Sequence, residues 1–233
     1  MTIRSKQLLF FVLLLACSGW VSVVVYRSTH FPWIIYRQGL NHFSENRFQE
    51  AIPALNSAIR NGISRIDAWM SLGDSYMATQ RFEDALDVYE GLLRIDPDNV
   101  QGTWKAAGLY EQFGRFDESL QKVRQLHLVR PNDPAVLLRT ARLLKYLGLW
   151  DDAAACYDRV LSDPSAPARI AVELAQIHIW KQEYPKAIER LRYALLNSPS
   201  DTQIRFWIAR ALFWGGNPEE AAVEYLRALG DPQ

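Results

Sequence analysis

Asp67 to Pro97 reads DAWMSLGDSYMATQRFEDALDVYEGLLRIDP, and this stretch recurs along the chain at a fixed period of 34 residues. Steps of 34 from Ala85 reach Ala51, Ser119, Ala153, Ala187 and Ala221 without an insertion or deletion. Steps of 34 from Gly73 reach Gly39, Ala107, Ala141, Ala175 and Ala209. A period of this length is typical of helix-turn-helix units that stack on their neighbours. The sequence therefore predicts an all-α fold in which these small residues mark close crossings of two helices.

The anchors of this pattern make residues 32–233 resemble six tandem tetratricopeptide repeats. The second copy matches the family pattern at Trp69, Leu72, Gly73, Tyr76, Ala85, Tyr89 and Pro97. The other copies keep the register but match less well, since only the second has Trp at the first anchor. The expected repeats span 32–65, 66–99, 100–133, 134–167, 168–201 and 202–233. The resemblance implies a solenoid of helix-turn-helix units wound into a right-handed superhelix.

The chain begins with a predicted membrane anchor. We expect a basic tail at 1–6, a transmembrane signal anchor at 7–26 and a juxtamembrane piece at 27–31. The run from Leu8 to Tyr26 carries no charge, and about 20 apolar residues are enough to cross a bilayer. Arg4, Lys6 and the terminal amine precede it, which favours an amino terminus in the cytoplasm. In a bacterium, the repeats would then face the periplasm from the inner membrane.

The same segment has two other interpretations. Leu14 to Cys17 loosely resembles a lipobox, which would place a lipid on Cys17 and the protein at the outer membrane. The apolar run continues through Tyr26, however, whereas a lipoprotein usually turns polar after its cysteine. Cleavage of a signal peptide followed by secretion is the other alternative. We favour the retained anchor because the apolar run is longer than the core of a signal peptide.

Composition and motifs give no indication of catalysis. The chain has 26 basic and 26 acidic residues, so its charge gives no reason to expect nucleic acid as a partner. No HExxH, CxxC or phosphate-loop pattern occurs, and the histidines have no ligand-type spacing. Cys156 is expected to pack on a second helix rather than act as a nucleophile. We therefore predict no enzyme activity, no cofactor and no metal site.

The resemblance implies that the first helix of each repeat lines a concave groove through repeat positions 2, 5, 9, 12 and 13. Position 5 reads Tyr36, Met70, Trp104, Leu138, Val172 and Phe206. Positions 9, 12 and 13 add Leu40, Phe43, Met77, Tyr146, Ile179, Trp180, Phe213 and Trp214. Extended apolar surfaces of this kind usually mark partner sites, so we predict a groove that binds a protein partner.

The predicted groove also carries charges of both signs. Asp74 and Glu111 lie in the second and third repeats. The fourth to sixth repeats carry Arg142, Lys145, Arg169 and Arg210. The pattern predicts an extended peptide or an amphipathic helix as ligand, with an acidic segment toward the carboxyl-terminal repeats.

The combined interpretation is a membrane-tethered scaffold in a bacterial envelope complex, such as one for exopolysaccharide export or cytochrome c maturation. Two alternatives remain open: a lipidated outer-membrane assembly factor for a pilus or secretin, and an organelle receptor with repeats facing the cytosol. Repeat arrays normally end in a helix with a polar outer face. Because Tyr225, Leu226 and Leu229 lie near the end of the sequence, we expect a partner or a second copy to cover them.

Overall fold

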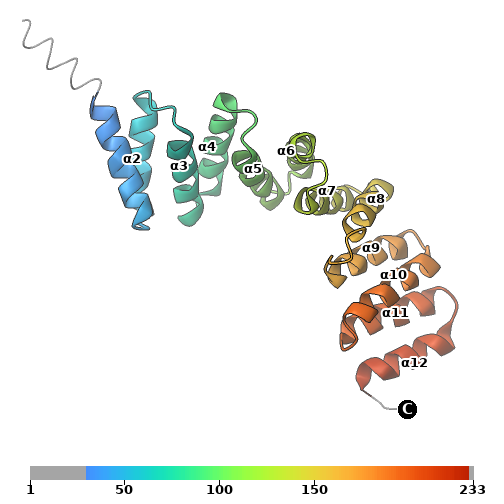
Figure 1. Ribbon diagram of the computed structural model, residues 1–233. Coiled ribbons are helices and arrows are strands. Elements are labelled where there is room, and N and C mark those ends of the chain that lie inside the picture. The colour runs from blue at the N-terminus through green and yellow to red at the C-terminus, as the bar shows by residue number, and fades with distance from the viewer. Residues whose placement is uncertain (1–29, 231–233) are drawn as a thin grey trace, which may run out of the picture. The chain divides into compact units, whose positions relative to one another are not determined.

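The computed structural model describes residues 30–230, and within that range every regular element is a helix (Figure 1). A helix over 30–44 is followed by α2 (Phe48–Arg60), α3 (Ile66–Ala78), α4 (Phe82–Ile95), α5 (Val100–Gln112), α6 (Phe116–Val129), α7 (Pro134–Tyr146), α8 (Trp150–Leu161), α9 (Ala168–Trp180), α10 (Tyr184–Asn197), α11 (Thr202–Trp214) and α12 (Pro218–Leu229). α3 contacts α2 and α4, and each helix from α6 to α11 contacts the helix that follows it. The predicted all-α solenoid of helix-turn-helix units is confirmed.

The helix boundaries follow the predicted period. The odd-numbered helices from α3 to α11 begin at Ile66, Val100, Pro134, Ala168 and Thr202, a constant spacing of 34 residues. The even-numbered helices from α2 to α12 begin at Phe48, Phe82, Phe116, Trp150, Tyr184 and Pro218, with the same spacing. We call the helix over 30–44 and the odd-numbered helices first helices, and the even-numbered ones second helices.

The chain divides into two compact units, Met1–Leu109 and Tyr110–Gln233. In the first unit, the small anchor residues sit where two helices cross closely. A Cβ added at Gly73 on α3 would lie 2.5 Å from Cε1 of Tyr89 on α4, and one added at Gly39 would lie 2.7 Å from the Leu55 side chain. Tyr89 and Leu55 are fully buried. The predicted reason for small residues at this repeat position, close contact between helices, is therefore confirmed in both pairs.

In the second unit, the same positions form the core between α9, α10, α11 and α12. Ala175 and Ala187 have no exposed surface, and they pack in one cluster with Leu191 and Ile208. Leu191 occupies the repeat position of Tyr89, 102 residues earlier, which is three repeat lengths. Each helix pair buries its apolar face partly against the next pair, which is how repeat arrays gain stability.

Each first helix ends in the same kind of turn. A residue with positive φ recurs every 34 residues in these turns, at Asn46, Gln80, Gly114, Gly148, Gln182 and Gly216. The following residue donates its backbone N–H five residues back, as from Arg81 to the Tyr76 carbonyl at 2.9 Å. A left-handed residue followed by this bond is a Schellman motif, which satisfies carbonyls at a helix end. The motif reverses the chain into the second helix.

Within residues 30–230, no helix is both long and apolar enough to cross a membrane. The predicted anchor at 7–26 lies outside the described residues, together with the basic tail and Cys17. The described chain begins with the helix over 30–44, which exposes Phe31, Trp33 and Ile34.

Candidate peptide-binding surface

The predicted groove residues differ in how far they are accessible. Tyr36, Met70 and Ile179 are buried. The Tyr36 hydroxyl donates to Asp67 at 2.7 Å and accepts from Arg65 Nε at 2.9 Å, so this side chain ties the first repeat to the second. Half-buried side chains make up a second group, consisting of Phe43, Met77, Trp104, Leu138, Val172 and Phe206. Only this group and the exposed residues described below can present surface to a ligand.

In the first unit, several predicted residues line one pocket. Its volume is about 720 Å³, and its walls include Phe43, Met70 and Asp74 together with Ile66 and Gln101. These residues come from the helix over 30–44, α3 and α5, which are successive first helices. The structure therefore brings Phe43, Met70 and Asp74 together on one face, as the repeat register predicts.

The carboxylate of this pocket is already paired. Lys105 Nζ donates to Asp74 at 2.7 Å, and the Tyr89 hydroxyl donates to the same carboxylate oxygen. Burial, together with the neighbouring Asp74 carboxylate, raises the pKa of Tyr89 well above its usual range. Asp74 is thus neutralised within the first unit and is not an open binding site for a cation.

In the second unit, Glu111 and Glu173 are paired in a similar way. Glu111 accepts from Arg139 Nε at 2.6 Å and from the Ser119 hydroxyl at 3.0 Å. Glu173 accepts two bonds from the Arg142 guanidinium, at 2.6 and 2.9 Å, and one from the Tyr157 hydroxyl at 2.7 Å. These bonds connect α5 to α7 and α7 to α9.

Two factors act in opposite directions on the pKa of Glu173. Its burial would raise the pKa, but the hydrogen bonds from Arg142 and Tyr157 outweigh burial and hold the pKa below its ordinary value. Lys145 Nζ lies 3.9 Å from the same carboxylate and 5.9 Å from the centre of the Tyr146 ring. Arg142 and Lys145, predicted to attract an acidic ligand, are therefore already occupied by a carboxylate of the protein.

Arg169 and Arg210 differ from Arg142 and Lys145 in their pairing. Both are exposed, and among residues 30–230 neither has a carboxylate within ion-pair distance. The Arg210 guanidinium lies 4.7 Å from the ring centre of Trp207 and 4.8 Å from that of Trp214. Arg169 lines a pocket of about 510 Å³ whose apolar walls include Val172, Ile204 and Trp207. This pocket, between α9 and α11, combines Arg169, which has no ion-pair partner among the described residues, with apolar surface and with Asp201, whose carboxylate accepts from the Gln203 N–H at the start of α11.

Four of the predicted aromatic residues are exposed in the second unit. Their exposed fractions are 67% for Tyr146, 49% for Trp180, 59% for Phe213 and 44% for Trp214. Tyr146 stacks on Phe116 with ring centres 5.0 Å apart, and Trp180 lies 6.2 Å from Trp150. Large aromatic side chains at the surface are the usual anchors of protein interfaces.

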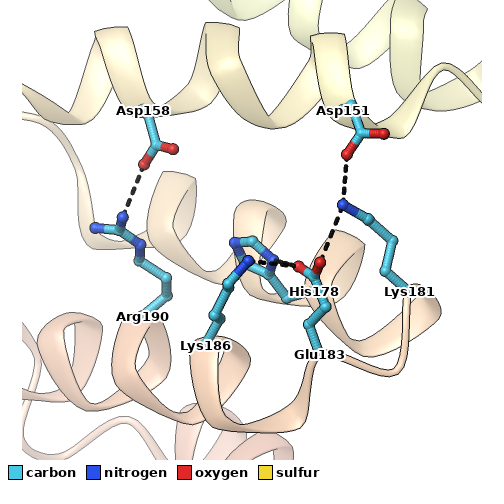
Figure 2. A network of polar contacts seen from close by, with 7 residues as sticks. All are labelled: Asp151, Asp158, His178, Lys181, Glu183, Lys186 and Arg190. Carbon is cyan, nitrogen blue, oxygen red and sulfur yellow. Dashed lines mark hydrogen bonds and ion pairs between the residues drawn. The ribbon is translucent and has the colours of Figure 1, made fainter.

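A polar network lies beside these rings. Figure 2 shows its members, Asp151, Asp158, His178, Lys181, Glu183, Lys186 and Arg190. Glu183 bonds His178 Nδ1 at 2.7 Å and Lys181 Nζ at 3.2 Å, while Lys181 also bonds Asp151. The His178 ring and then Lys181 lower the pKa of Glu183 to about 2. The network connects α8, α9 and α10, and it neutralises its own charges.

No group of metal-ligating side chains occurs among residues 30–230. His178 is buried against its own repeat, and the Cys156 thiol is half-buried. Burial raises the pKa of Cys156, which disfavours the reactive thiolate.

Comparison with known proteins identifies the family. A model of the tetratricopeptide repeat matches residues 36–100, 71–136, 138–187 and 173–232. The chain belongs to this family. A comparison with curated proteins found no match.

Solved structures give the same fold for this tetratricopeptide repeat protein. A crystal structure of MamA superposes with a TM-score of 0.65 at 19% identity, covering 70% of this chain and 89% of MamA. A tetratricopeptide repeat protein from Parabacteroides merdae ATCC 43184 gives 0.66 at 16% identity, covering 87% of this chain and 80% of that one. YrrB, described as a TPR protein with an unusual peptide-binding site, gives 0.64 at 19% identity, with coverages of 73% and 87%. At these identities the likeness concerns the fold alone.

The sequence analysis missed one set of residues in this tetratricopeptide repeat protein. The first residue of each second helix is aromatic in five pairs, namely Phe48, Phe82, Phe116, Trp150 and Tyr184. Steps of 34 from Phe82 would have found them. They were missed because the expected groove was restricted to first helices.

Proposed function

We propose that this protein is a membrane-tethered adaptor that binds an acidic, partly apolar segment of a protein partner on α7, α9 and α11. The observation that carries the proposal is the contrast between paired and unpaired charges on this surface. Asp74, Glu111 and Arg142 are bonded to neighbouring repeats, whereas Arg169 and Arg210 have no carboxylate partner among the described residues. A ligand carboxylate would supply the missing partner.

The surroundings of the two arginines suit a peptide. The pocket beside Arg169 offers Val172, Ile204 and Trp207 to an apolar side chain, and Arg210 lies against two Trp rings. Arg and Trp are the residues most often found to dominate binding energy at interfaces. YrrB, which has the same fold, is described as having a peptide-binding site. We infer that an acidic residue flanked by a large apolar one occupies this pocket.

The membrane tether in this proposal is supported by the uncharged run from Leu8 to Tyr26 and by the basic residues before it. With the amino terminus in the cytoplasm, the repeats project into the periplasm of a bacterium. An adaptor in that place would serve an envelope assembly, such as exopolysaccharide export or cytochrome c maturation.

Site-specific photo-crosslinking in living cells tests the proposal. A photo-reactive amino acid replaces Val172 inside the pocket in one strain and Leu196, an exposed residue on the second helix α10, in another. We expect a partner that crosslinks from position 172 and not from position 196. The double substitution Arg169→Glu and Arg210→Glu should reduce that crosslink at least tenfold, since it puts like charge opposite the acidic segment.

The control is the double substitution Arg94→Glu and Arg124→Glu, which makes the same charge change at exposed residues of the second helices α4 and α6. An equal loss in this control and in the variant at positions 169 and 210 would show that net charge, not this pocket, controls binding. Identical adducts from positions 172 and 196 would also contradict the proposal. The intact mass of the purified protein tests the tether, since a cleaved or lipidated amino terminus excludes a retained anchor.

A further inference from the structure

The exposed aromatic residues of the second unit form part of a longer series. Six aromatic residues, separated alternately by 30 and 4 positions, make up what we call the aromatic strip: Phe116, Tyr146, Trp150, Trp180, Tyr184 and Trp214. They alternate between the first residue of a second helix and the last residue of a first helix. The 30-residue steps join neighbouring repeats, and the 4-residue steps cross the turn within one repeat.

Ring contacts connect the strip across the repeats. Phe116 and Tyr146 are stacked, with an angle of 6° between their planes, and Trp150 and Trp180 are tilted by 38° at 6.2 Å. At the next repeat, a Cβ added to Gly215 would lie 3.2 Å from Cβ of Tyr184, which puts Tyr184 beside the end of α11, where Trp214 is the last residue. The strip therefore continues through three repeat junctions of the second unit.

The rings of the strip carry hydrogen-bond donors that are not used within the described part of the protein. Five of its six rings carry an O–H or an indole N–H, and Phe116 is the exception. Within residues 30–230, none of these five donors has a hydrogen-bond partner. Tyr146, Trp180 and Trp214 are also exposed. The strip thus offers a ligand both apolar ring surface and a row of donors.

Charge distinguishes the middle of the strip from its Trp214 end. Near Trp150 and Trp180, the carboxylates of Asp151 and Glu183 are already bonded to Lys181 (Figure 2). At the Trp214 end, the exposed Arg210 guanidinium lies over the indole ring without a carboxylate partner among the described residues. A ligand that follows the strip therefore meets neutral surface first and an unneutralised cation at Trp214.

We propose that the aromatic strip binds a proline-rich segment in the polyproline II conformation that carries acidic residues at its Trp214 end. This inference rests on the proposed function and names the class of peptide that the adaptor takes. Polyproline II helices have no internal hydrogen bonds, so their carbonyls are free to accept from ring donors. Aromatic-lined surfaces recognise such segments because the ligand is already extended and loses little entropy.

The length of one polyproline II turn is close to the usual distance between packed helices. Polyproline II has three residues per turn and a rise of about 3.1 Å per residue, so one turn covers roughly 9 Å. Packed helices lie about 8–10 Å apart. The Arg142–Glu173 bonds show that α7 and α9 lie within side-chain reach of each other. One turn of the ligand is therefore about as long as the usual spacing of packed helices.

Binding of defined peptides to the full-length protein in detergent tests the inference. The probe is a fluorescein-labelled peptide of nine prolines followed by three aspartates, and the reference peptide replaces the prolines by glycine and serine. Fluorescence anisotropy should show at least tenfold tighter binding of the proline peptide. Trp180→Ala should weaken that binding at least tenfold, and Trp180→Phe, which keeps an aromatic ring and loses the N–H donor, about threefold.

Trp33→Ala is the matched control, because Trp33 is 48% exposed and Trp180 is 49% exposed. Tyr146→Ala provides a second test in case Trp180→Ala unfolds the protein. Equal affinity for the proline and reference peptides would overturn the inference, as would equal binding by the Trp180→Ala and Trp33→Ala variants. Replacing the three aspartates by lysines should weaken binding at least fivefold, and unchanged affinity would contradict the acidic end.

The failure of this inference can be told apart from failure of the proposed function. A partner that crosslinks from position 172 and is not displaced by the proline peptide would leave the adaptor function intact and overturn the inference. Tight binding of the proline peptide without any partner crosslinked from position 172 would support the peptide specificity of the strip and contradict the proposed adaptor site.

Discussion

Glu173→Ala should destabilise the contact between α8 and α9 through one buried hydroxyl. The Glu173 carboxylate accepts from Tyr157 at 2.7 Å and from both bonded nitrogens of Arg142. Tyr157 is fully buried, so its hydroxyl cannot turn to water when the acceptor is removed. The variant therefore leaves a buried donor without a partner.

The expected magnitude follows from these two contacts. An unsatisfied buried hydroxyl costs about 1–3 kcal/mol. The Glu173–Arg142 pair, whose Arg side chain is 41% exposed, contributes only about 0.2–1 kcal/mol. We expect a total loss of about 2 kcal/mol. Tyr157→Phe removes the donor instead and should cost about 1 kcal/mol, the net value of a typical hydrogen bond.

Hydrogen exchange followed by mass spectrometry is the suitable assay, because repeat arrays can open segment by segment. A loss of about 2 kcal/mol corresponds to roughly 30-fold faster exchange in peptides from α8 and α9. Peptides from α3, which has no contact with this network, serve as the internal control. The double variant Glu173→Ala with Tyr157→Phe should lose about 1 kcal/mol less stability than the sum of the losses in the two single variants.

Additive losses in that double variant would refute the reasoning, because they would mean that the Tyr157 hydroxyl gains nothing from Glu173. Unchanged exchange in Glu173→Ala would refute it more directly. Faster exchange in α3 as well would indicate global unfolding rather than a local effect.

Two further predictions concern packing and pH. Gly73→Ala should accelerate exchange in α3 and α4, since overpacking against the Tyr89 ring costs about 1–3 kcal/mol and the gain in helix propensity offsets only about 1 kcal/mol; slower exchange would contradict this. Glu183 has a pKa lowered to about 2, so its contribution to stability is present above about pH 4.5 and is lost as pH falls toward 2. Between pH 5 and pH 2, the melting temperature should therefore fall less steeply in Glu183→Gln than in the unchanged protein. Equal slopes of melting temperature against pH would show that Glu183 adds no pH dependence.

The fold was predictable because its determinants are local and repeated. The period read from Ala85 and Gly73 places every helix start between Phe48 and Pro218. The tight approach of Gly73 to Tyr89 also agrees with the physical reason given for a small residue. The left-handed turn residue was harder to foresee, because Gly114 indicates it and Gln80 does not. There the Schellman hydrogen bonds stabilise a conformation that the side chain does not favour.

The candidate surface was only partly predictable, because accessibility and pairing depend on the neighbouring repeat. The register assigned these residues to the first helices, but it could not show that Met70 is buried while Val172 is half-buried. The groove charges were interpreted residue by residue, yet Asp74 and Arg142 each pair with a residue 31 positions later. That spacing is three residues short of one repeat, so a search for opposite charges 31 residues apart would have found both pairs.

The Tyr anchor of the repeat shows why a family pattern tolerates substitution. Tyr76 and Tyr110 each lie 4.6 Å from an arginine five residues later, across the Schellman turn. In the fifth repeat the same two positions hold His178 and Glu183, joined by a hydrogen bond of 2.7 Å. The charged partner is thus an arginine in the second and third repeats and a glutamate in the fifth, and the ring is a tyrosine in the former and a histidine in the latter. The contact across the turn is present in all three. The fourth and sixth repeats place Leu144 and Leu212 at the ring position, with Leu149 and Asn217 five residues later, so the repeat tolerates the loss of this contact as well as the exchange of its partners.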